Sequence, residues 1–224
     1  MDQAQILGNA EAFAATVFAG DFSGHDLSHT QRVFRLAAYL QSREGGDRFV
    51  IGLAALLHDV DDYKLFGPAG ESLPKAREFL ATAGVSTDTA KAVLAAIATV
   101  SFKGTDTVRP QTPEGRIVQD ADRLDALGAI GIGRAFAYGG SRGQPMYDPA
   151  IRPLAAMDQE TYRNHRGTTI NHFREKLFRL KDLMNTETAR ELAVGRTETM
   201  TAFVAAFESE WTAKPVALEP IWQQ

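Results

Sequence analysis

Hydrophobic residues recur at intervals of three and four positions along most of this chain, a period that is typical of amphipathic helices. Near the N-terminus Ile6, Ala10 and Val17 follow it, and Val33 and Leu40 follow it in the next segment. Runs of alternating hydrophobic and polar residues, which would predict strands, do not occur in the sequence. The helices predicted in this way cover residues 3–19, 23–46, 47–60, 73–84, 86–100, 111–127, 128–140, 158–184 and 186–211.

Glycines and polar cap residues mark the ends of several of these helices. Gly45 and Gly46 end the second helix, Thr112 followed by Pro113 starts a later one, and Thr186 starts the last. No linker, internal repeat or low-complexity segment divides the sequence. We therefore predict an all-α fold that forms a single domain over residues 1–224.

Three segments depart from the ordinary amphipathic pattern. Residues 47–60 are hydrophobic on most of the helix circumference, which predicts a buried helix. Residues 128–140 are rich in glycine and continue the preceding helix, which indicates close packing against a neighbour. The loop at about 139–157 exceeds the usual length of a helix connection, and loops of that length are often functional lids.

Composition narrows the class of protein. Hydrophobic residues make up 44% of the chain and charged residues 23%, which is ordinary for a globular protein. A net charge of −4 argues against a general nucleic-acid or anionic-membrane binder, and the absence of cysteine excludes disulfides, thiolate zinc sites and cysteine nucleophiles. Asp2 and Glu11 do not fit a signal peptide, and no hydrophobic run approaches a membrane span, so we expect a cytoplasmic protein.

Charged residues gather where the buried third helix ends, in the stretch "AALLHDVDDYK". Charges beside a hydrophobic core are costly unless something binds them. His58 and Asp59 in this stretch, together with His29 and Asp122 in other hydrophobic contexts, offer imidazole and carboxylate groups that suit a divalent metal ion. Adjacent side chains on a regular helix diverge by about 100°, so His58 and Asp59 reach one ion only near a helix end.

Several motifs, in this order, carry a resemblance to a known family: "SGHDLSHTQRV", "LLHDVDDYK", "VSFKG", "IVQDADRLDALGAIGIGRAF", "GGSRGQPMYDP" and "HFREKLFRLKDLMNTETARELAVGRTETM". The chain resembles the HD-domain metal-dependent phosphohydrolase superfamily, and within it the small stand-alone bacterial hydrolases of the YedJ type. The resemblance runs from about residue 20 to 211. It implies a helical bundle with a central metal site, in which the motif region covers about 20–140 and the helices at about 158–211 pack on it.

By this resemblance the metal ligands are His29, His58, Asp59 and Asp122. Asp120 is the competing fourth ligand, but the family pattern places the ligand in Ala-Asp-Arg, which here is Asp122. The ion is Mn, Mg, Co, Ni, Fe or Zn, and its identity and number stay open.

Two further residues of the charged stretch are assigned to catalysis. In related HD nucleotidases an acidic residue at the offset of Asp62 acts as general acid or orients the attacking water. Lys64 offers a positive charge for a phosphate group. The alternative for each is a solvated loop residue, and we expect that role for Asp61.

Other polar residues are candidates for the phosphate-binding part of the site. The alternative roles for His25 are an extra metal ligand and a helix-cap residue. The alternative role for Arg32 is a surface ion pair. His165 and His172 lie seven residues apart and so on one face of the predicted helix. Arg123 is assigned a structural pairing with Asp120 or Asp125. The residues assigned to phosphate binding are His25, Arg32, Lys103, His172 and Lys176, with Arg134 and Arg142 as weaker candidates.

These features predict a hydrolase whose activated water attacks the phosphorus of a nucleotide or another small phosphate ester or anhydride. Pyrophosphate release from nucleoside triphosphates is the specific reaction we favour. A nonhydrolytic nucleotide-binding or regulatory module is the alternative from another class. A di-iron oxygenase needs additional histidines around a second metal, and the chain has only five.

Overall fold

A computed structural model describes residues 1–20, 24 and 26–212, except for the side chains of Lys64, Leu65, Pro68, Ala69, Glu71 and Arg163. Every regular element in this part of the chain is helical, which confirms the all-α prediction. No helix in the described ranges is long and hydrophobic enough to cross a membrane.

Twelve α-helices follow one another along the described chain: α1 (Gln3–Val17), α2 (Leu27–Glu44), α3 (Arg48–Leu57), α4 (Tyr63–Phe66), α5 (Pro74–Thr82), α6 (Thr87–Ile97), α7 (Pro113–Asp125), α8 (Gly128–Ser141), α9 (Gln159–Asn164), α10 (Thr169–His172), α11 (Phe178–Leu180) and α12 (Glu187–Trp211). The 3₁₀ turns are Gly67–Ser72, Gly104–Asp106 and Lys181–Leu183, and Phe173–Leu177 forms a π-helical turn.

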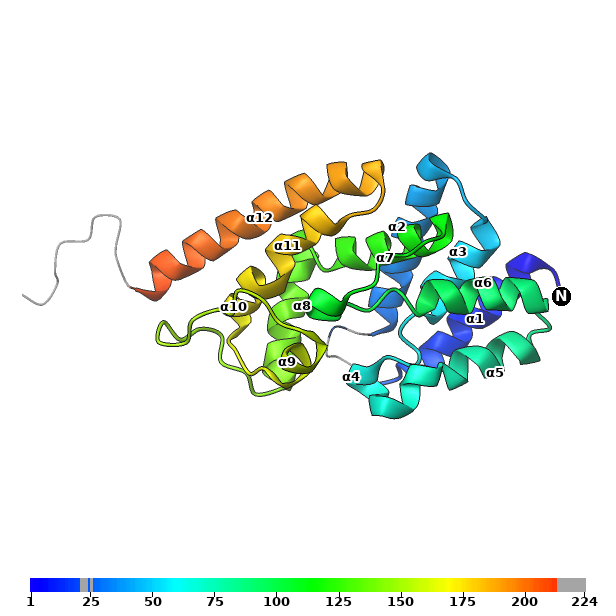
Figure 1. Ribbon diagram of the computed structural model, residues 1–224, viewed down its shortest axis with the longest axis horizontal. Helices are drawn as coiled ribbons and strands as arrows, with labels where there is room; N and C mark the ends of the chain where they lie inside the picture. The colour runs from blue at the N-terminus through cyan, green and yellow to red at the C-terminus, as the bar shows by residue number, and fades with distance from the viewer. Residues whose placement is uncertain (21–23, 25, 213–224) are drawn as a thin grey trace, which may run out of the picture.

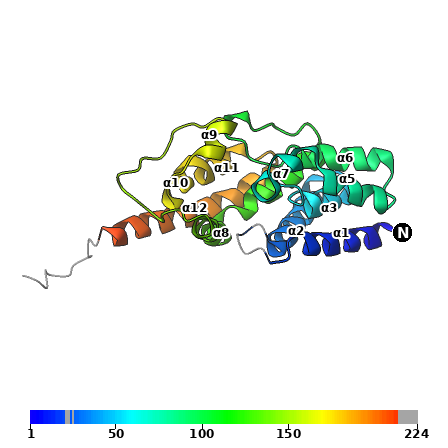
Figure 2. The ribbon, with the colours of Figure 1, turned by 90° about the horizontal axis from the view of Figure 1, so that it is seen from below.

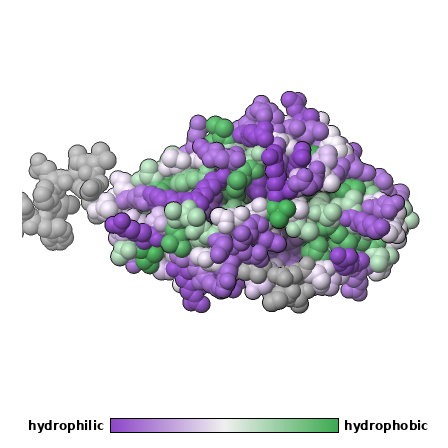
Figure 3. Space-filling view, viewed as in Figure 1, coloured by the Kyte–Doolittle hydropathy of each residue, from purple (hydrophilic) through white to green (hydrophobic). Residues whose placement is uncertain are grey.

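The helices form two groups that meet at α7 and α8. Figure 1 shows α1 to α6 in one half of the molecule and α8 to α12 in the other, and Figure 2 shows the same division from below. In the first group α3 packs against α1, α2, α6 and α7, while in the second α8 packs against α10 and α12. Hydrophilic side chains predominate on the face seen in Figure 3, with smaller hydrophobic areas between them.

Helix α3 lies at the centre of the first group, as its hydrophobic circumference predicts. Asp47 caps its N-terminus by accepting hydrogen bonds from the backbone N–H groups of Phe49 and Val50. From Val50 to Leu57 every side chain is buried. Because full burial of one leucine stabilises a fold by about 1.5–3 kcal/mol, this helix holds the end at His58 firmly in place.

Asp120 on α7 fixes the start of α12. Its carboxylate accepts hydrogen bonds from the backbone N–H groups of Asn185 and Thr186, from the Asn185 amide and from the Thr186 hydroxyl, at 2.8–3.1 Å. The Thr186 hydroxyl in turn caps α12. Asp120 is fully buried and faces α12, so its role is structural.

We expect Asp120→Asn to lower the free energy of unfolding by about 2–4 kcal/mol, because an amide replaces an acceptor that serves several buried donors. Urea unfolding monitored by circular dichroism measures this. The matched control is Asp88→Asn on the exposed surface of α6, for which we expect a change below about 0.5 kcal/mol. A loss below about 1 kcal/mol for Asp120→Asn would contradict this role.

The glycine-rich segment forms a separate helix instead of continuing α7. The chain turns at Ala126 and Leu127, and Gly128 opens α8 with a φ of +72°, a conformation that suits glycine. The expected close packing is present, since a Cβ atom on Gly128 would lie 3.2 Å from the Arg196 side chain on α12. A Cβ atom on Gly131 would clash with the Ala126 carbonyl oxygen.

The prediction of one helix over 158–184 is wrong. Helix α9 ends before His165, which has extended backbone angles, and helical structure resumes only at α10. A π-helical turn then interrupts the ordinary period over Phe173–Leu177. His165 and His172 therefore do not share one face of a helix. Gly167 and the capping residue Thr168 lie within this break, and both are sequence signals that the prediction of one helix overlooked.

The long loop between α8 and α9, residues 142–158, is held against the helices. The Pro145 carbonyl accepts a hydrogen bond from the Thr169 backbone N–H at 2.9 Å. The Leu154 N–H donates to the Glu175 carboxylate at 3.1 Å, and Glu175 is itself buried in the π-helical turn. In the structure this segment packs against α10 and the π-helical turn and forms a wall beside them.

Candidate metal centre and adjoining cavity

Three helix ends bring two histidines and two aspartates together. The His29 Nε2 atom on α2 lies 3.2 Å from His58 Nε2, 3.2 Å from Asp59 Oδ2 and 3.4 Å from Asp122 Oδ1. His58 Nε2 lies 3.4 Å from Asp59 Oδ2 and 3.9 Å from Asp122 Oδ1. His58 and Asp59 directly follow the last turn of α3, where the chain leaves the regular helix and both side chains turn the same way.

Hydrogen bonds on the far side of each imidazole orient the ring. His29 Nδ1 lies 2.7 Å from an Asp125 oxygen, and His58 Nδ1 lies 2.8 Å from the Ala55 carbonyl oxygen. Both partners are acceptors, so each ring donates from Nδ1 and turns Nε2 toward the cluster. There the two Nε2 atoms meet two carboxylates, an arrangement that positive charge among them stabilises, either as a bound metal ion or as protons on the imidazoles.

The electrostatics of the cluster fit a cation. Burial lowers the pKa of His58, but the Asp59 and Asp122 carboxylates outweigh it and raise the pKa to about 9. Burial likewise raises the pKa of Asp59, yet the neighbouring imidazoles hold it well below the usual value. Among the residues that the structure describes, no donor forms a hydrogen bond with the buried Asp59 Oδ2. The residues therefore fit a divalent metal ion, with three of them buried and Asp122 partly open to solvent.

Asp125 forms a second layer behind His29. Its Oδ2 atom accepts from His29 Nδ1 at 2.7 Å, from an Arg32 terminal nitrogen at 3.0 Å and from an Arg134 terminal nitrogen at 3.0 Å, while its Oδ1 accepts from Arg32 Nε at 2.7 Å. Burial alone would raise the Asp125 pKa, but the hydrogen bonds from His29 and Arg32 lower it far below its usual value. Asp125 therefore stays ionised and holds the His29 ring.

We expect chelator-treated protein to lose stability as the pH falls below about 4. The pKa of Asp125 is lower in the folded state than its unfolded value of 3.8, so its stabilising contribution is present above pH 3.8 and is lost on acidification. Urea unfolding between pH 2.5 and 6 should give a flatter profile for Asp125→Asn than for the wild type. Parallel profiles would contradict this assignment.

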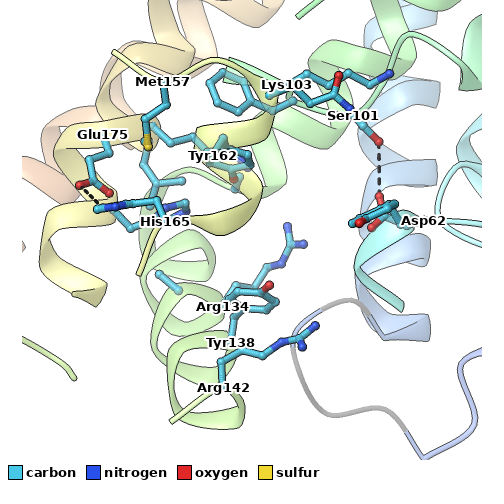
Figure 4. Close-up of a pocket in the computed structure, with 18 of the residues that line it drawn as sticks. Asp62, Ser101, Lys103, Arg134, Tyr138, Arg142, Met157, Tyr162, His165 and Glu175 are labelled. Atoms are coloured by element: carbon cyan, nitrogen blue, oxygen red, sulfur yellow. Dashed lines mark hydrogen bonds and ion pairs between the residues drawn. The ribbon is translucent and has the colours of Figure 1, made fainter. Parts of the chain in front are cut away.

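A cavity of about 1180 Å³ adjoins the cluster. Figure 4 shows Arg134 and Tyr138 of α8 and Arg142 just after it along one wall, Asp62 and Ser101 opposite them, and further residues from α9 and the neighbouring loops. His58 lines the same cavity, so the metal cluster opens into it. The π-helical turn and α10 complete the wall with His172, Glu175 and Lys176.

The two aspartates that follow the cluster have different surroundings. Both line the cavity, but they have different partners. Asp62 Oδ2 accepts a hydrogen bond from the Ser101 hydroxyl at 3.3 Å (Figure 4). Asp61 accepts from the backbone N–H groups of Lys75 and Ala76 at 3.2 and 2.9 Å and so caps α5. Asp61 is buried, so the expectation of a solvated loop residue is wrong and its role is structural.

The residues assigned to phosphate binding do not all reach the cavity. Lys103, His172 and Lys176 line it. Arg32 is bound to Asp125, so the structure places it behind His29. His25 lies outside the described residues. The side chain of Lys64 does too, although its backbone belongs to α4.

Arg123 is a structural residue, as expected, but its partner differs from the expected ones. Its guanidinium donates a hydrogen bond to the Leu183 carbonyl at the end of the 3₁₀ turn before α12. Sequence reasoning also missed Ser101 beside Asp62. The one signal for Ser101 was its place in "VSFKG", two residues before Lys103.

The fold and this cluster place the chain in a class of all-helical proteins in which two histidines and two aspartates meet at one candidate metal site. The family model "HD domain" matches residues 26–127, which include all four. The protein YpgQ of Bacillus subtilis (strain 168) is 40% identical over 197 residues, covering 87% of this chain and 88% of YpgQ. The chain therefore belongs to the HD-domain family and is an HD-superfamily hydrolase of the YpgQ-like kind.

Solved structures agree with this assignment. A Lactobacillus plantarum protein is 44% identical, with a TM-score of 0.87, covering 96% of this chain and 100% of that chain. An HD-superfamily hydrolase of Bacillus thuringiensis is 41% identical, with a TM-score of 0.71, covering 95% and 100%. YpgQ in complex with ADP is 35% identical over the aligned structure, with a TM-score of 0.71, covering 93% and 97%.

Proposed function

We propose that this protein is a metal-dependent phosphohydrolase of the YedJ type, acting as a single domain. Its substrate is a nucleotide or another small phosphate ester or anhydride, and the specific reaction is release of pyrophosphate from a nucleoside triphosphate. The observation that carries the proposal is the cluster of His29, His58, Asp59 and Asp122, with ligand atoms 3.2–3.9 Å apart, beside a cavity of about 1180 Å³.

His29, His58, Asp59 and Asp122 would hold the divalent ion. When bound, such an ion polarises a phosphoryl oxygen and makes a water molecule more acidic. The orientation of both rings through Nδ1 keeps their lone pairs available for this purpose.

The remaining chemistry belongs to side chains of the cavity. Asp62 is placed to accept a proton from the attacking water and to return it to the leaving oxygen as the phosphorus–oxygen bond breaks. The Ser101 hydroxyl holds the Asp62 carboxylate in position. Lys103 and Lys176 supply positive charge for the phosphate oxygens.

Two observations support a nucleotide as the substrate. The related YpgQ was crystallised with ADP. In this chain Phe102 and Tyr162 form an edge-to-face pair at 5.3 Å, and the Lys176 ammonium lies 5.2 and 5.7 Å from their ring centres. Aromatic rings beside a cation offer both a surface for a base and a charge for a phosphate.

A phosphate-release screen tests the proposal. Purified protein is incubated with nucleoside mono-, di- and triphosphates and sugar phosphates, each with Mn, Mg, Co or Ni. We expect release of pyrophosphate from at least one triphosphate with at least one metal, and none after chelation. Inactivity toward the entire panel, with ADP still bound, would contradict hydrolysis and support the alternative of a regulatory nucleotide-binding module.

A further inference from the structure

Arg134 on α8 occupies the boundary between the cavity and the metal cluster. Its side chain lines the cavity, where Figure 4 shows it between Tyr138 and Asp62. On the other side, its Nε donates to the Gly24 carbonyl at 2.8 Å and a terminal nitrogen donates to Asp125 Oδ2 at 3.0 Å. One guanidinium therefore reaches both the substrate space and the residue that orients His29.

The bonds of Arg134 leave part of the guanidinium available. An arginine has five N–H donors in a planar fork, and within the described residues two of them are used, on Gly24 and Asp125. The side chain is 15% exposed, which is enough to present donors to the cavity without releasing the buried bonds. An anion in the cavity thus meets a cation whose position the protein has already fixed.

Asp125 transmits the position of this arginine to the cluster. Arg134 and His29 Nδ1 bind the same carboxylate oxygen, at 3.0 and 2.7 Å. Arg32 binds both oxygens of this carboxylate but does not line the cavity. Lys176 lines the cavity from the π-helical turn, and its ammonium lies 5.2 Å from the Phe102 ring centre. Among these three cations, Arg134 alone both lines the cavity and binds Asp125.

We propose that Arg134 is a bifunctional positioning residue: it holds Asp125, and through it the metal ligand His29, while it binds an anionic group of the substrate from the cavity side. This inference rests on the proposed function, because it assumes a metal ion at the cluster and a phosphate in the cavity. It gives Arg134 a part in both metal binding and substrate binding. Arg32 has only the first of these parts, and Lys176 has only the second.

Two titrations on chelator-treated protein test the proposal, one with Mn²⁺ alone and one with inorganic pyrophosphate alone, by calorimetry. We expect Arg134→Gln to weaken both affinities by about tenfold or more, as loss of a second-layer hydrogen bond and of a charged anion contact each predict. Arg32→Gln should weaken only Mn²⁺ binding, and Lys176→Gln only pyrophosphate binding. Thermal unfolding confirms that each variant is folded.

Arg134→Lys separates a positioning role from a general structural one. Lysine keeps the charge but cannot span Gly24 and Asp125 at once, so we expect pyrophosphate binding to return to within about threefold of wild type while Mn²⁺ binding stays weak. This variant also decides the matter if Arg134→Gln does not fold. Equal recovery or equal loss of both affinities in the lysine variant would overturn the inference.

The outcomes distinguish this inference from the proposed function. If wild-type protein binds no Mn²⁺, the proposed function fails, and the inference falls with it. If wild-type protein binds both probes and Arg134→Gln weakens only one of them, the inference alone is overturned.

Discussion

His58→Ala is expected to abolish Mn²⁺ binding and to lower phosphohydrolase activity at least about 1,000-fold. A change behind a metal ligand already costs about 10–100-fold, and removal of the ligand itself costs more. His58 Nε2 lies within 3.9 Å of each of the other three ligand atoms, so its loss opens one side of the cluster. Calorimetric titration with Mn²⁺ and steady-state kinetics measure the two effects.

Asp61→Asn is the matched control, because Asp61 belongs to the same charged stretch and is also buried. It caps α5 through Lys75 and Ala76, so the substitution should lower stability and leave Mn²⁺ affinity within about threefold of wild type. Full activity of folded His58→Ala would contradict the proposed metal centre.

Asp62→Asn is expected to lower kcat by about 100–10,000-fold, the usual contribution of general acid–base catalysis, while Mn²⁺ binding is retained. The amide keeps the shape of the side chain and cannot accept the proton of the attacking water. Single-turnover measurements at saturating substrate isolate the chemical step from product release.

Ser101→Ala separates the proton transfer by Asp62 from the positioning of its carboxylate. The Ser101 hydroxyl bonds Asp62 at 3.3 Å, so its loss should reduce kcat by about tenfold or less. A kcat for Asp62→Asn within about threefold of wild type would contradict the catalytic role of Asp62.

The pattern of hydrophobic residues was enough to predict most of the fold. The spacing in α1 and α2 and the hydrophobic circumference of α3 each indicated a helix that the structure contains. The break after α9 was missed although Gly167 and the cap residue Thr168 lie within it. The π-helical turn at Phe173–Leu177 has no such local signal. Glu175 in that turn binds His165 and the Leu154 backbone, which are 10 and 21 residues away.

The four candidate ligands were found for two reasons. Each is a carboxylate or imidazole group in a hydrophobic context, and the family resemblance assigned each of them to a metal-binding motif. The fold brings them to one point, although their occupancy by a metal remains a prediction. The second layer was largely missed. Nothing in the sequence around Asp125 shows that it meets Arg32, 93 residues away, instead of solvent. Partners at such separations depend on how α2 and α7 cross.

The anchored loop at 142–158 has a consequence for the kinetics of binding. Besides its contacts to Thr169 and Glu175, its Met157 carbonyl accepts a hydrogen bond from the Thr105 N–H at 2.9 Å. Ligands that enter such a preformed space meet no closure step, so binding should follow a single exponential whose observed rate rises linearly with ligand concentration. Selectivity would then arise from the rate at which each ligand leaves.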